Sequence, residues 1–329
     1  FVEPEGWNTV EVYVNGFCTS LPEDVQFHAL RSVKGFESVK FFRPGYAIEY
    51  DYFPPTQLKN SLETKPVAGL FFAGQINGTT GYEEAAAQGL MAGINAHLLI
   101  NAKDPFVLKR NEAYIGVLID DLITKGTEEP YRMFTSRAEY RTLLRQDNAD
   151  LRLSEISHKL GLASKQRVAN VEDKRTNTEA FVSFFKKTSV KPESINPILS
   201  LKNSSEISQS MKLYKLFSRP NISLDDMLSL ESVKLFLEKN DFKNDVLEQT
   251  EVQVKYSGYI EKEKANAEKL NNLENIKIPT TFNYSKVQSL SSEAIQKLNK
   301  IKPSTLSQAS RISGVSPNDI SVLMVYMGR

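Results

Sequence analysis

The sequence predicts an α/β region followed by an all-α region. A short apolar run at residues 69–73 is typical of a buried strand, and it leads through three glycines into a helical pattern that begins near Tyr82. Other strand-like patterns lie before this run, whereas none is convincing after about residue 105. Apolar residues recur at helical spacing over the remaining chain. We therefore expect domains at residues 1–103, 104–250 and 251–329.

The glycines after the predicted strand are the strongest indication of a binding site. Gly74, Gly78 and Gly81 form a turn in which backbone can approach a bound group closely, because glycine has no side chain. The helix start that follows offers free N–H groups and a positive dipole end to an anion or a polarised carbonyl. The spacing differs from the Gly-x-Gly-x-x-Gly turn of a dinucleotide site, which no other stretch of the chain supplies.

The predicted helix from Tyr82 is rich in small residues at three- and four-residue spacing. Interior glycines cost helix stability, roughly 1 kcal/mol each, so we expect close packing of another backbone to compensate. An ordinary tight contact between a helix and a sheet also explains the helix taken alone. The small residues are Ala85, Gly89, Ala92, Gly93 and Ala96.

Composition limits the classes of function. The chain has 329 residues with a net charge of +1, so any nucleic-acid contact must come from a local patch. The single cysteine, Cys18, excludes an intrachain disulfide and fits a reducing, cytoplasmic compartment. The three histidines lack metal-ligand spacing, so we expect no metal site. No apolar run is long enough to cross a membrane.

Several further elements are predicted before the glycine turn. Residues 11–14 and 39–43 are typical of strands, and a helix is expected from Pro22 to near Gly35. Val25, Leu30 and Val33 would form its buried side. Residues 47–51 alternate as a half-buried strand does, which would place Glu49 and Asp51 on one face. That pair could act as acid and base, but a solvated face is favoured.

After the glycine turn we expect helices. They are predicted at 111–124, where Gly126 ends the helix, and at 164–187, 223–240 and 244–272. In the last of these, Val252, Tyr256 and Ile260 would share an apolar face. Residues 188–222 are expected to contain loops and to be weakly specified. Short helices fill the last fifty residues. The last begins at Ser316 and Pro317. Its apolar stripe indicates core packing, with a tip open to a partner protein. The stripe consists of Ile320, Leu323, Met324 and Met327.

An arginine-rich stretch indicates a possible RNA contact. A helix capped by Thr135 or Ser136 would place Arg137, Arg141 and Arg145 on one side over about 12 Å, with Arg132 just before it. Guanidinium groups pair bidentately with phosphate, which suits nucleic acid. Alternatively, acidic neighbours could neutralise the arginines, and both interpretations stay open. Those neighbours are Glu128, Glu129, Asp147 and Asp150.

Three stretches together closely resemble the GidA/MnmG family. They are RPGYAIEYD at 43–51, the segment from Gly69 to Gly89, and EPYRMFTSRAEYR at 129–141 with DNADLR at 147–152. The resemblance runs from Phe1 to the end and is weakest around 188–245. It implies an FAD-dependent enzyme that installs a carboxymethylaminomethyl group at C5 of the tRNA wobble uridine. Family members use NADH and methylene-folate, form homodimers and act with the GTPase MnmE.

The resemblance also implies roles for particular residues. Gln75 matches an FAD-contact position, the turn and helix start would lie near the flavin ring, the arginine stretch would bind tRNA, and the last helices would contact MnmE. The expected FAD-binding residues are Gly74, Gln75, Asn77, Gly78, Gly81, Tyr82, Glu83, Glu84 and Ala85, and the expected tRNA-binding residues are Arg132, Arg137, Arg141 and Arg145.

The resemblance further predicts an incomplete Rossmann-type FAD domain followed by a helical domain. The chain opens without methionine, so we expect the C-terminal part of a larger protein. The family's dinucleotide turn, NADH-binding insertion and catalytic cysteines would precede Phe1, and Cys18 matches neither cysteine. This part alone would then be inactive and hold FAD weakly. Two alternatives remain: a folate-dependent tRNA methyltransferase like TrmFO, which the long helical region disfavours, and a non-catalytic module that binds tRNA or a protein.

Overall fold

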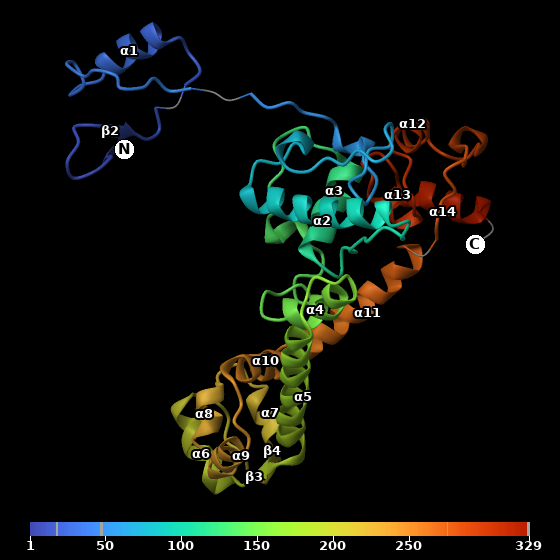
Figure 1. Ribbon diagram of the computed structural model, residues 1–329. Coiled ribbons are helices and arrows are strands. Elements are labelled where there is room, and N and C mark those ends of the chain that lie inside the picture. Colours follow the sequence, from blue (N-terminus) through green and yellow to red (C-terminus); the bar gives the residue numbers. More distant parts are fainter. Residues whose placement is uncertain (18, 47–48, 275, 328–329) are drawn as a thin grey trace. The chain divides into compact units, whose positions relative to one another are not determined.

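The computed structural model describes residues 1–17, 19–46, 49–274 and 276–327 (Figure 1). The chain divides into two compact units, Phe1–Tyr52 and Phe53–Arg329. In the first unit, β1 (Val2–Pro4) pairs antiparallel with β2 (Val12–Val14), which confirms the strand predicted at 11–14. The unit also contains α1 (Glu23–Arg31), which begins after Pro22 as predicted.

The rest of the first unit differs from the prediction. Leu30 and the amide of Gln26 are buried, whereas Val25 and Val33 are exposed. Gln26 Nε2 donates to Leu21 O at 2.6 Å and to Gly45 O at 2.9 Å, so a polar side chain anchors the helix. The described residues at 39–43 form no strand, since no neighbouring strand pairs with them. Residues 47 and 48 of the strand predicted at 47–51 lie outside the described residues; Glu49 and Asp51 are exposed.

The second unit begins with irregular chain around the glycine turn. A 3₁₀ turn, η1 (Pro55–Gln57), and the bridge Leu58↔Thr64 precede the run at 69–73. That run is not the predicted strand: only Phe71 bridges to Glu63, because no strand runs beside it in the described residues. Then follow η2 (Gln75–Asn77) and α2 (Tyr82–Ile100), which confirms the predicted helix.

The prediction for the small residues of α2 is wrong at its glycines. A Cβ added at Gly89 or Gly93 would meet nothing within 4 Å among the described residues, so no backbone packs there. The helix instead buries the side holding Met91, Ala92 and Leu98. This side packs on α3 (Tyr114–Lys125), which ends at Gly126 with φ +72° as predicted.

The helical region that follows is built around phenylalanines. After α4 (Ala149–Lys159), the long α5 (Lys165–Lys187) packs on α10 (Asn244–Lys255). Phe181 and Phe185 of α5 are fully buried, and their rings contact those of Phe236 and Phe217, respectively. Residues 188–222 are more ordered than predicted, because their apolar residues join this core. Its other elements are β3 (Ser189–Val190), α6 (Pro192–Leu201), β4 (Met211–Lys212), α7 (Leu213–Phe217), α8 (Leu224–Leu228) and α9 (Glu231–Lys239).

The face of α10 is also different from the one expected. Val246 and Val254 are buried, whereas Val252 is half-buried and Tyr256 is 51% exposed. The helix ends at Lys255 and α11 (Ser257–Glu274) begins anew, so the predicted stripe, which needs one continuous helix from 244 to 272, is broken.

The chain ends in a small helical bundle. It contains η4 (Tyr284–Lys286), α12 (Ser292–Ile301), α13 (Leu306–Arg311) and α14 (Pro317–Tyr326). Ser316 and Asp319 form the predicted capping box of α14, and Ile320 and Leu323 are in the bundle core. α13 also contacts α3 and α11, which joins the bundle to the rest of this unit.

The predicted order, an α/β region followed by an all-α region, is only partly confirmed. The described residues contain two sheets, β1–β2 and β3–β4, each two-stranded and antiparallel, and the second lies in the region expected to be helical. The Rossmann-type character of residues 1–103 therefore stays a prediction. Within the described part of the chain, no helix combines the length and apolarity needed to cross a membrane.

Candidate functional site

The glycine turn takes a conformation that requires glycine at two positions. Gly74 has φ +87° and Gly78 has φ +78°, both in the region that side-chain-bearing residues rarely adopt. Between them, η2 makes a single tight turn. The chain then enters α2 at Gly81, where no side chain caps the helix. The first-turn N–H groups therefore depend on other partners.

A buried polar network fixes this turn. Gln88 lies almost two turns into α2 with no exposed surface, and its Oε1 accepts from Gly74 N at 3.2 Å and from Asn77 Nδ2 at 2.8 Å. Its Nε2 donates to Thr79 Oγ1 at 2.9 Å. Thr79 Oγ1 in turn donates to Gly74 O at 3.0 Å. One glutamine thus ties both arms of the turn to the helix.

Glu84 gives the helix start an unusual chemistry. The residue is 4% exposed, its Oε1 accepts from Met133 N at 2.6 Å, and Arg132 Nε lies 3.7 Å from the same oxygen. The carboxylate lies against Gly81, so a Cβ at that position would collide with it. Its Oε2 and the Oδ1 of Asn77 are buried without a hydrogen-bond partner among the described residues. Unpaired buried acceptors are costly, and a bound donor would satisfy them.

The expected FAD-binding residues are gathered at this place with different exposures. Gly74, Asn77, Gly81 and Glu84 are buried, Gln75, Gly78 and Ala85 are half-buried, and Tyr82 and Glu83 are exposed. The first-turn acids Glu83 and Glu84 disfavour a phosphate at the helix start. Free N–H groups beside an unpaired acceptor oxygen suit a neutral group that carries both carbonyl and N–H, as the flavin ring does. The residues present therefore fit the ring better than the pyrophosphate.

The residues 131–133 run directly beside the turn. Tyr131 N donates to Gly78 O at 2.8 Å, and Thr79 and Tyr131 form a parallel bridge. Together with the bond from Met133 to Glu84, these contacts fix this stretch against both the turn and α2. The arginine-bearing part of the chain is thereby placed next to the glycine turn.

A buried charge cluster also bonds to the arginine-bearing part of the chain, at Glu139. Arg110, 6% exposed, donates to Asp120 at 3.1 Å, to Asp121 at 2.7 Å and to Glu139 at 2.7 Å. Arg311 of α13 makes two further bonds to Asp120, at 2.7 and 2.8 Å. The cluster thus connects α3, the residues around 139 and the C-terminal bundle.

Protonation in the cluster follows from this geometry. Burial alone would raise the pKa of Asp121, but the charges and hydrogen bonds of Arg110 and Lys125 hold that pKa below its ordinary value. Burial, the charge of Asp121 and the bond that Tyr131 Oη donates to it at 2.9 Å raise the pKa of Tyr131 well above its usual range. Asp121 is therefore ionised and Tyr131 neutral near neutral pH.

The predicted arginine helix is wrong. Only Thr135–Arg137 forms a 3₁₀ turn, and α-helix begins again at Ala149. Ala138 and Tyr140 are both buried although they are two residues apart, a spacing that one helix face cannot provide. The arginines consequently do not share one helix face.

Each arginine has its own surroundings. Arg137 lies over the ring of Tyr131 at 4.2 Å and donates to Arg132 O at 2.7 Å. Arg145 pairs with Asp147 at 3.0 Å, one of the acidic partners weighed from the sequence. Arg141 is exposed, and its side chain makes no ion pair within the described residues. Acidic partners therefore neutralise Arg145, through Asp147, and partly neutralise Arg132, through Glu84.

Sequence reasoning did not single out Gln88, Arg110 or Asp121. Gln88 is a polar residue within a stretch of α2 that is otherwise small and apolar from Ala85 to Ile94, which was the available signal. Arg110 carries no such signal because its partners lie on α3 and at Glu139, and Asp121 carries none because Arg110 and Tyr131 are ten or more residues away.

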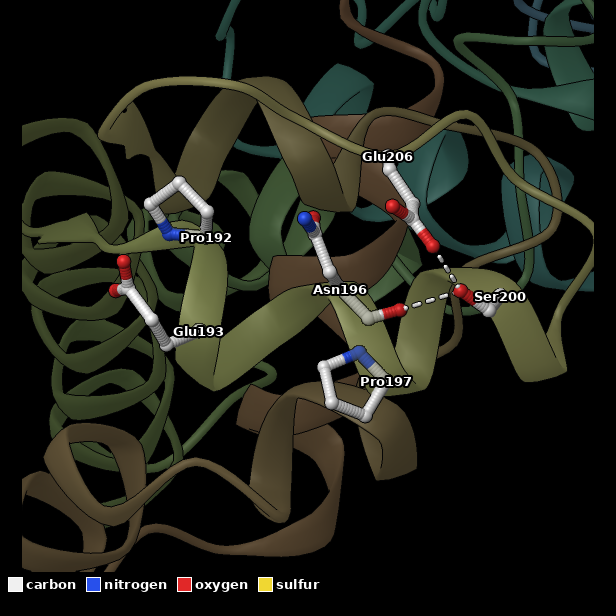
Figure 2. A pocket seen from close by; sticks show the side chains of 6 residues that line it. All are labelled: Pro192, Glu193, Asn196, Pro197, Ser200 and Glu206. Carbon is white, nitrogen blue, oxygen red and sulfur yellow. Dashed lines mark hydrogen bonds between the residues drawn. The ribbon is translucent and has the colours of Figure 1, made fainter.

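Two hollows lie away from the glycine turn. One, of about 410 Å³, is lined by α6 and Glu206; Figure 2 shows Ser200 between Asn196 O and the Glu206 carboxylate. Its carboxylates, Glu193 and Glu206, do not suit a phosphate. The other, of about 490 Å³, lies on the C-terminal bundle between residues 286–289 and 321–326. Val325 and Tyr326 at its edge are 77% and 53% exposed.

Family models match three successive segments of the chain. The family model described as glucose inhibited division protein A matches residues 1–104. Models of the C-terminal helical domain and the C-terminal helical bundle of the tRNA modifying enzyme MnmG/GidA match residues 165–264 and 266–329. The chain belongs to the GidA/MnmG family.

Individual relatives are similar over the whole chain. The tRNA uridine 5-carboxymethylaminomethyl modification enzymes MnmG of Christiangramia forsetii and Flavobacterium psychrophilum are 70% and 67% identical over 329 residues, which are all of this chain and 53% of each relative. The form II crystal structure of Aquifex aeolicus GidA is 46% identical with a TM-score of 0.79, covering 100% of this chain and 51% of that one. The chain thus spans about half the length of the curated relatives it matches.

Proposed function

We propose that this chain forms part of an FAD-dependent enzyme that installs a carboxymethylaminomethyl-type group at C5 of the tRNA wobble uridine. One observation carries the proposal beyond family membership. The hydrogen bonds from Tyr131 to Gly78 and from Met133 to Glu84 place an arginine-bearing segment beside the glycine turn. An RNA strand held by these arginines would present a base next to a flavin held by the turn.

In this proposal, the glycine turn and the start of α2 hold the flavin ring. The contacts come from Gly74, Gln75, Asn77, Gly78, Gly81, Tyr82, Glu83, Glu84 and Ala85. The unpaired oxygens of Asn77 and Glu84 support a ligand that donates hydrogen bonds here. Bound FAD would supply redox chemistry with NADH as reductant and methylene-folate as carbon donor. Gln88 keeps the turn in its binding conformation.

The proposed tRNA contacts are Arg132, Arg137, Arg141 and Arg145. Arg132, Arg137 and Arg141 are exposed, so their guanidinium groups can reach phosphate oxygens. Arg145 would have to exchange Asp147 for a phosphate. The stacking of Arg137 on Tyr131 orients one of these cations without neutralising it.

The hollow on the C-terminal bundle is the proposed docking place of the GTPase MnmE. Exposed Val325 and Tyr326 beside this hollow give an apolar anchor with a polar tip. Association as a homodimer in the cytoplasm is proposed on the family resemblance. A non-catalytic tRNA-binding module is the second candidate, and the same arginines support it.

Titration of the chain with tRNA and, separately, with FAD tests the proposal. Replacing Arg132, Arg137 and Arg141 by Gln should flatten the dependence of log K on log salt by about two to three phosphate contacts. The control variant changes Lys234, Lys239 and Lys243, in and between α9 and α10, to Gln. These lysines lie among acidic residues, which makes them better controls than Lys165, Arg167 and Lys186. Unchanged tRNA binding by the arginine variant would refute the assigned RNA site.

The titration with FAD distinguishes part of an enzyme from a module that only binds tRNA or a protein. We expect quenching of FAD fluorescence on titration with the chain, and loss of that quenching in the Gly78→Val variant, because φ +78° disfavours a branched side chain. A thermal melt of this variant checks that the fold persists. Absence of FAD binding to the parent chain, with tRNA binding retained, would favour the module.

A further inference from the structure

A second cationic surface lies at the end of α5. We define the β3–β4 lysine surface as five exposed residues that two separate segments bring together through β3–β4 pairing. Neither 180–192 nor 207–224 contains an acidic residue, although the chain as a whole has 40 acidic and 41 basic residues. The five are Lys186, Lys187, Lys191, Lys212 and Lys215.

The positions of these lysines are fixed by defined contacts. Ser189 pairs with Lys212 in the sheet, and Lys212 Nζ donates to Lys187 O at 2.7 Å. Lys186 Nζ lies 5.2 Å from the centre of the Tyr214 ring. Within the described residues, none of the five lysines forms an ion pair with a carboxylate. Their mutual repulsion is therefore not relieved by a direct ion pair.

A purely structural role explains only part of the surface. Lys186 and Lys187 lie in the last turn of α5, where cations stabilise the helix dipole, and Lys212 caps a carbonyl of the same helix. Lys191 and Lys215 lie outside α5, at the start of α6 and in α7. A polyanion along the surface would engage all five cations at once.

We propose that the β3–β4 lysine surface binds the phosphate backbone of the RNA, as a contact separate from the arginine-bearing segment. The inference rests on the proposed function, in which tRNA is the substrate. α4, which follows the arginines in sequence, packs on α5 through Lys174 and Asp150, 3.1 Å apart. Lys186 lies twelve residues further along α5, about 18 Å away at 1.5 Å per residue.

Figure 1 shows β3 and β4 at the end of α5 that lies away from α4. One RNA arm following α5 can therefore reach both cationic surfaces. The arginines would position the reacting end, and the lysines would hold the arm without reading its sequence.

The test uses the full 329-residue chain in a salt series with tRNA. The variant replaces Lys187, Lys191 and Lys215 by Gln, because all three are exposed and their side chains form no hydrogen bond or ion pair with any described residue. We expect a slope of log K against log salt reduced by about two to three, and roughly tenfold or greater loss of affinity at low salt. The matched control changes Lys234, Lys239 and Lys243 to Gln and should lose less than threefold.

The outcomes distinguish this inference from the proposed function. If the lysine variant binds tRNA as the parent does while the arginine variant fails, the lysine inference is overturned and the proposed site stands. If only the lysine variant weakens, the inference stands and the arginine assignment falls. Equal binding to an unrelated duplex RNA supports backbone recognition. Binding to phosphatidylserine vesicles, with none to tRNA, overturns the inference.

Discussion

The helical region around α5 and the arginine-bearing segment at 130–139 are both firmly held, but by different interactions. The first is held by fully buried rings, with Phe181 and Phe185 5.0 Å apart and Phe185 and Phe217 5.1 Å apart. The second is held by directional hydrogen bonds, which Arg110 donates to Glu139 and Glu84 accepts from Met133 N. The hydrophobic effect that buries the rings is non-directional, whereas these hydrogen bonds fix particular backbone groups in place.

The largest effect is expected in the aromatic core. Phe185→Ala leaves a cavity between α5 and α7, and should lower the free energy of unfolding by about 3–5 kcal/mol. Denaturant unfolding followed by circular dichroism measures it. Leu235→Ala on α9, where the side chain is 59% exposed, should stay within about 0.5 kcal/mol. Similar losses from both variants would contradict the contrast between core and surface.

Breaking the charge cluster should cost nearly as much for a different reason. Arg110→Met leaves Asp121 buried beside Asp120 without its main cation, a loss of about 3–5 kcal/mol. Adding Asp121→Asn to this variant should recover part of the loss, because the uncompensated charge disappears. A double-mutant cycle measures this coupling. Strictly additive losses would show that Arg110 stabilises by packing instead.

A smaller effect is expected from acid. Because the folded-state pKa of Asp121 lies below its ordinary value of 3.8, its ionised form stabilises the fold above that pH. This contribution is lost as the pH falls through the lower folded value. The difference in unfolding free energy between the parent and Asp121→Asn should therefore shrink below about pH 3.8. A difference independent of pH would exclude Asp121 as the responsible group, whereas the aromatic core offers no such titration.

Local patterns predicted the helices well because burial and capping leave signals close in sequence. Ser164 caps α5 and Ser316 caps α14, and apolar spacing marks both helices. The arginine helix failed because spacing between charges is no burial signal: the buried Ala138 and Tyr140, two residues apart, decide the path. The strand predicted at 69–73 failed because strands require partners.

The glycine turn was predictable as a turn, but the bonds that shape it were not. Positive φ at Gly74 and Gly78 follows from the residue type. The role of Gln88 depends on its reaching back fourteen residues to Gly74, and that of Arg110 on Glu139, twenty-nine residues away. Such long-range polar pairs leave no periodic trace in a single sequence.

Asp319 caps two helices with one carboxylate. Its Oδ1 accepts from Ser291 N at 2.9 Å, at the start of α12, and its Oδ2 accepts from Ser316 N at 2.9 Å, at the start of α14. Neither helix start can fray without giving up an acceptor that serves both. The amide hydrogens of the two first turns should therefore exchange with solvent in one shared opening event, so that the bundle opens as a single cooperative unit.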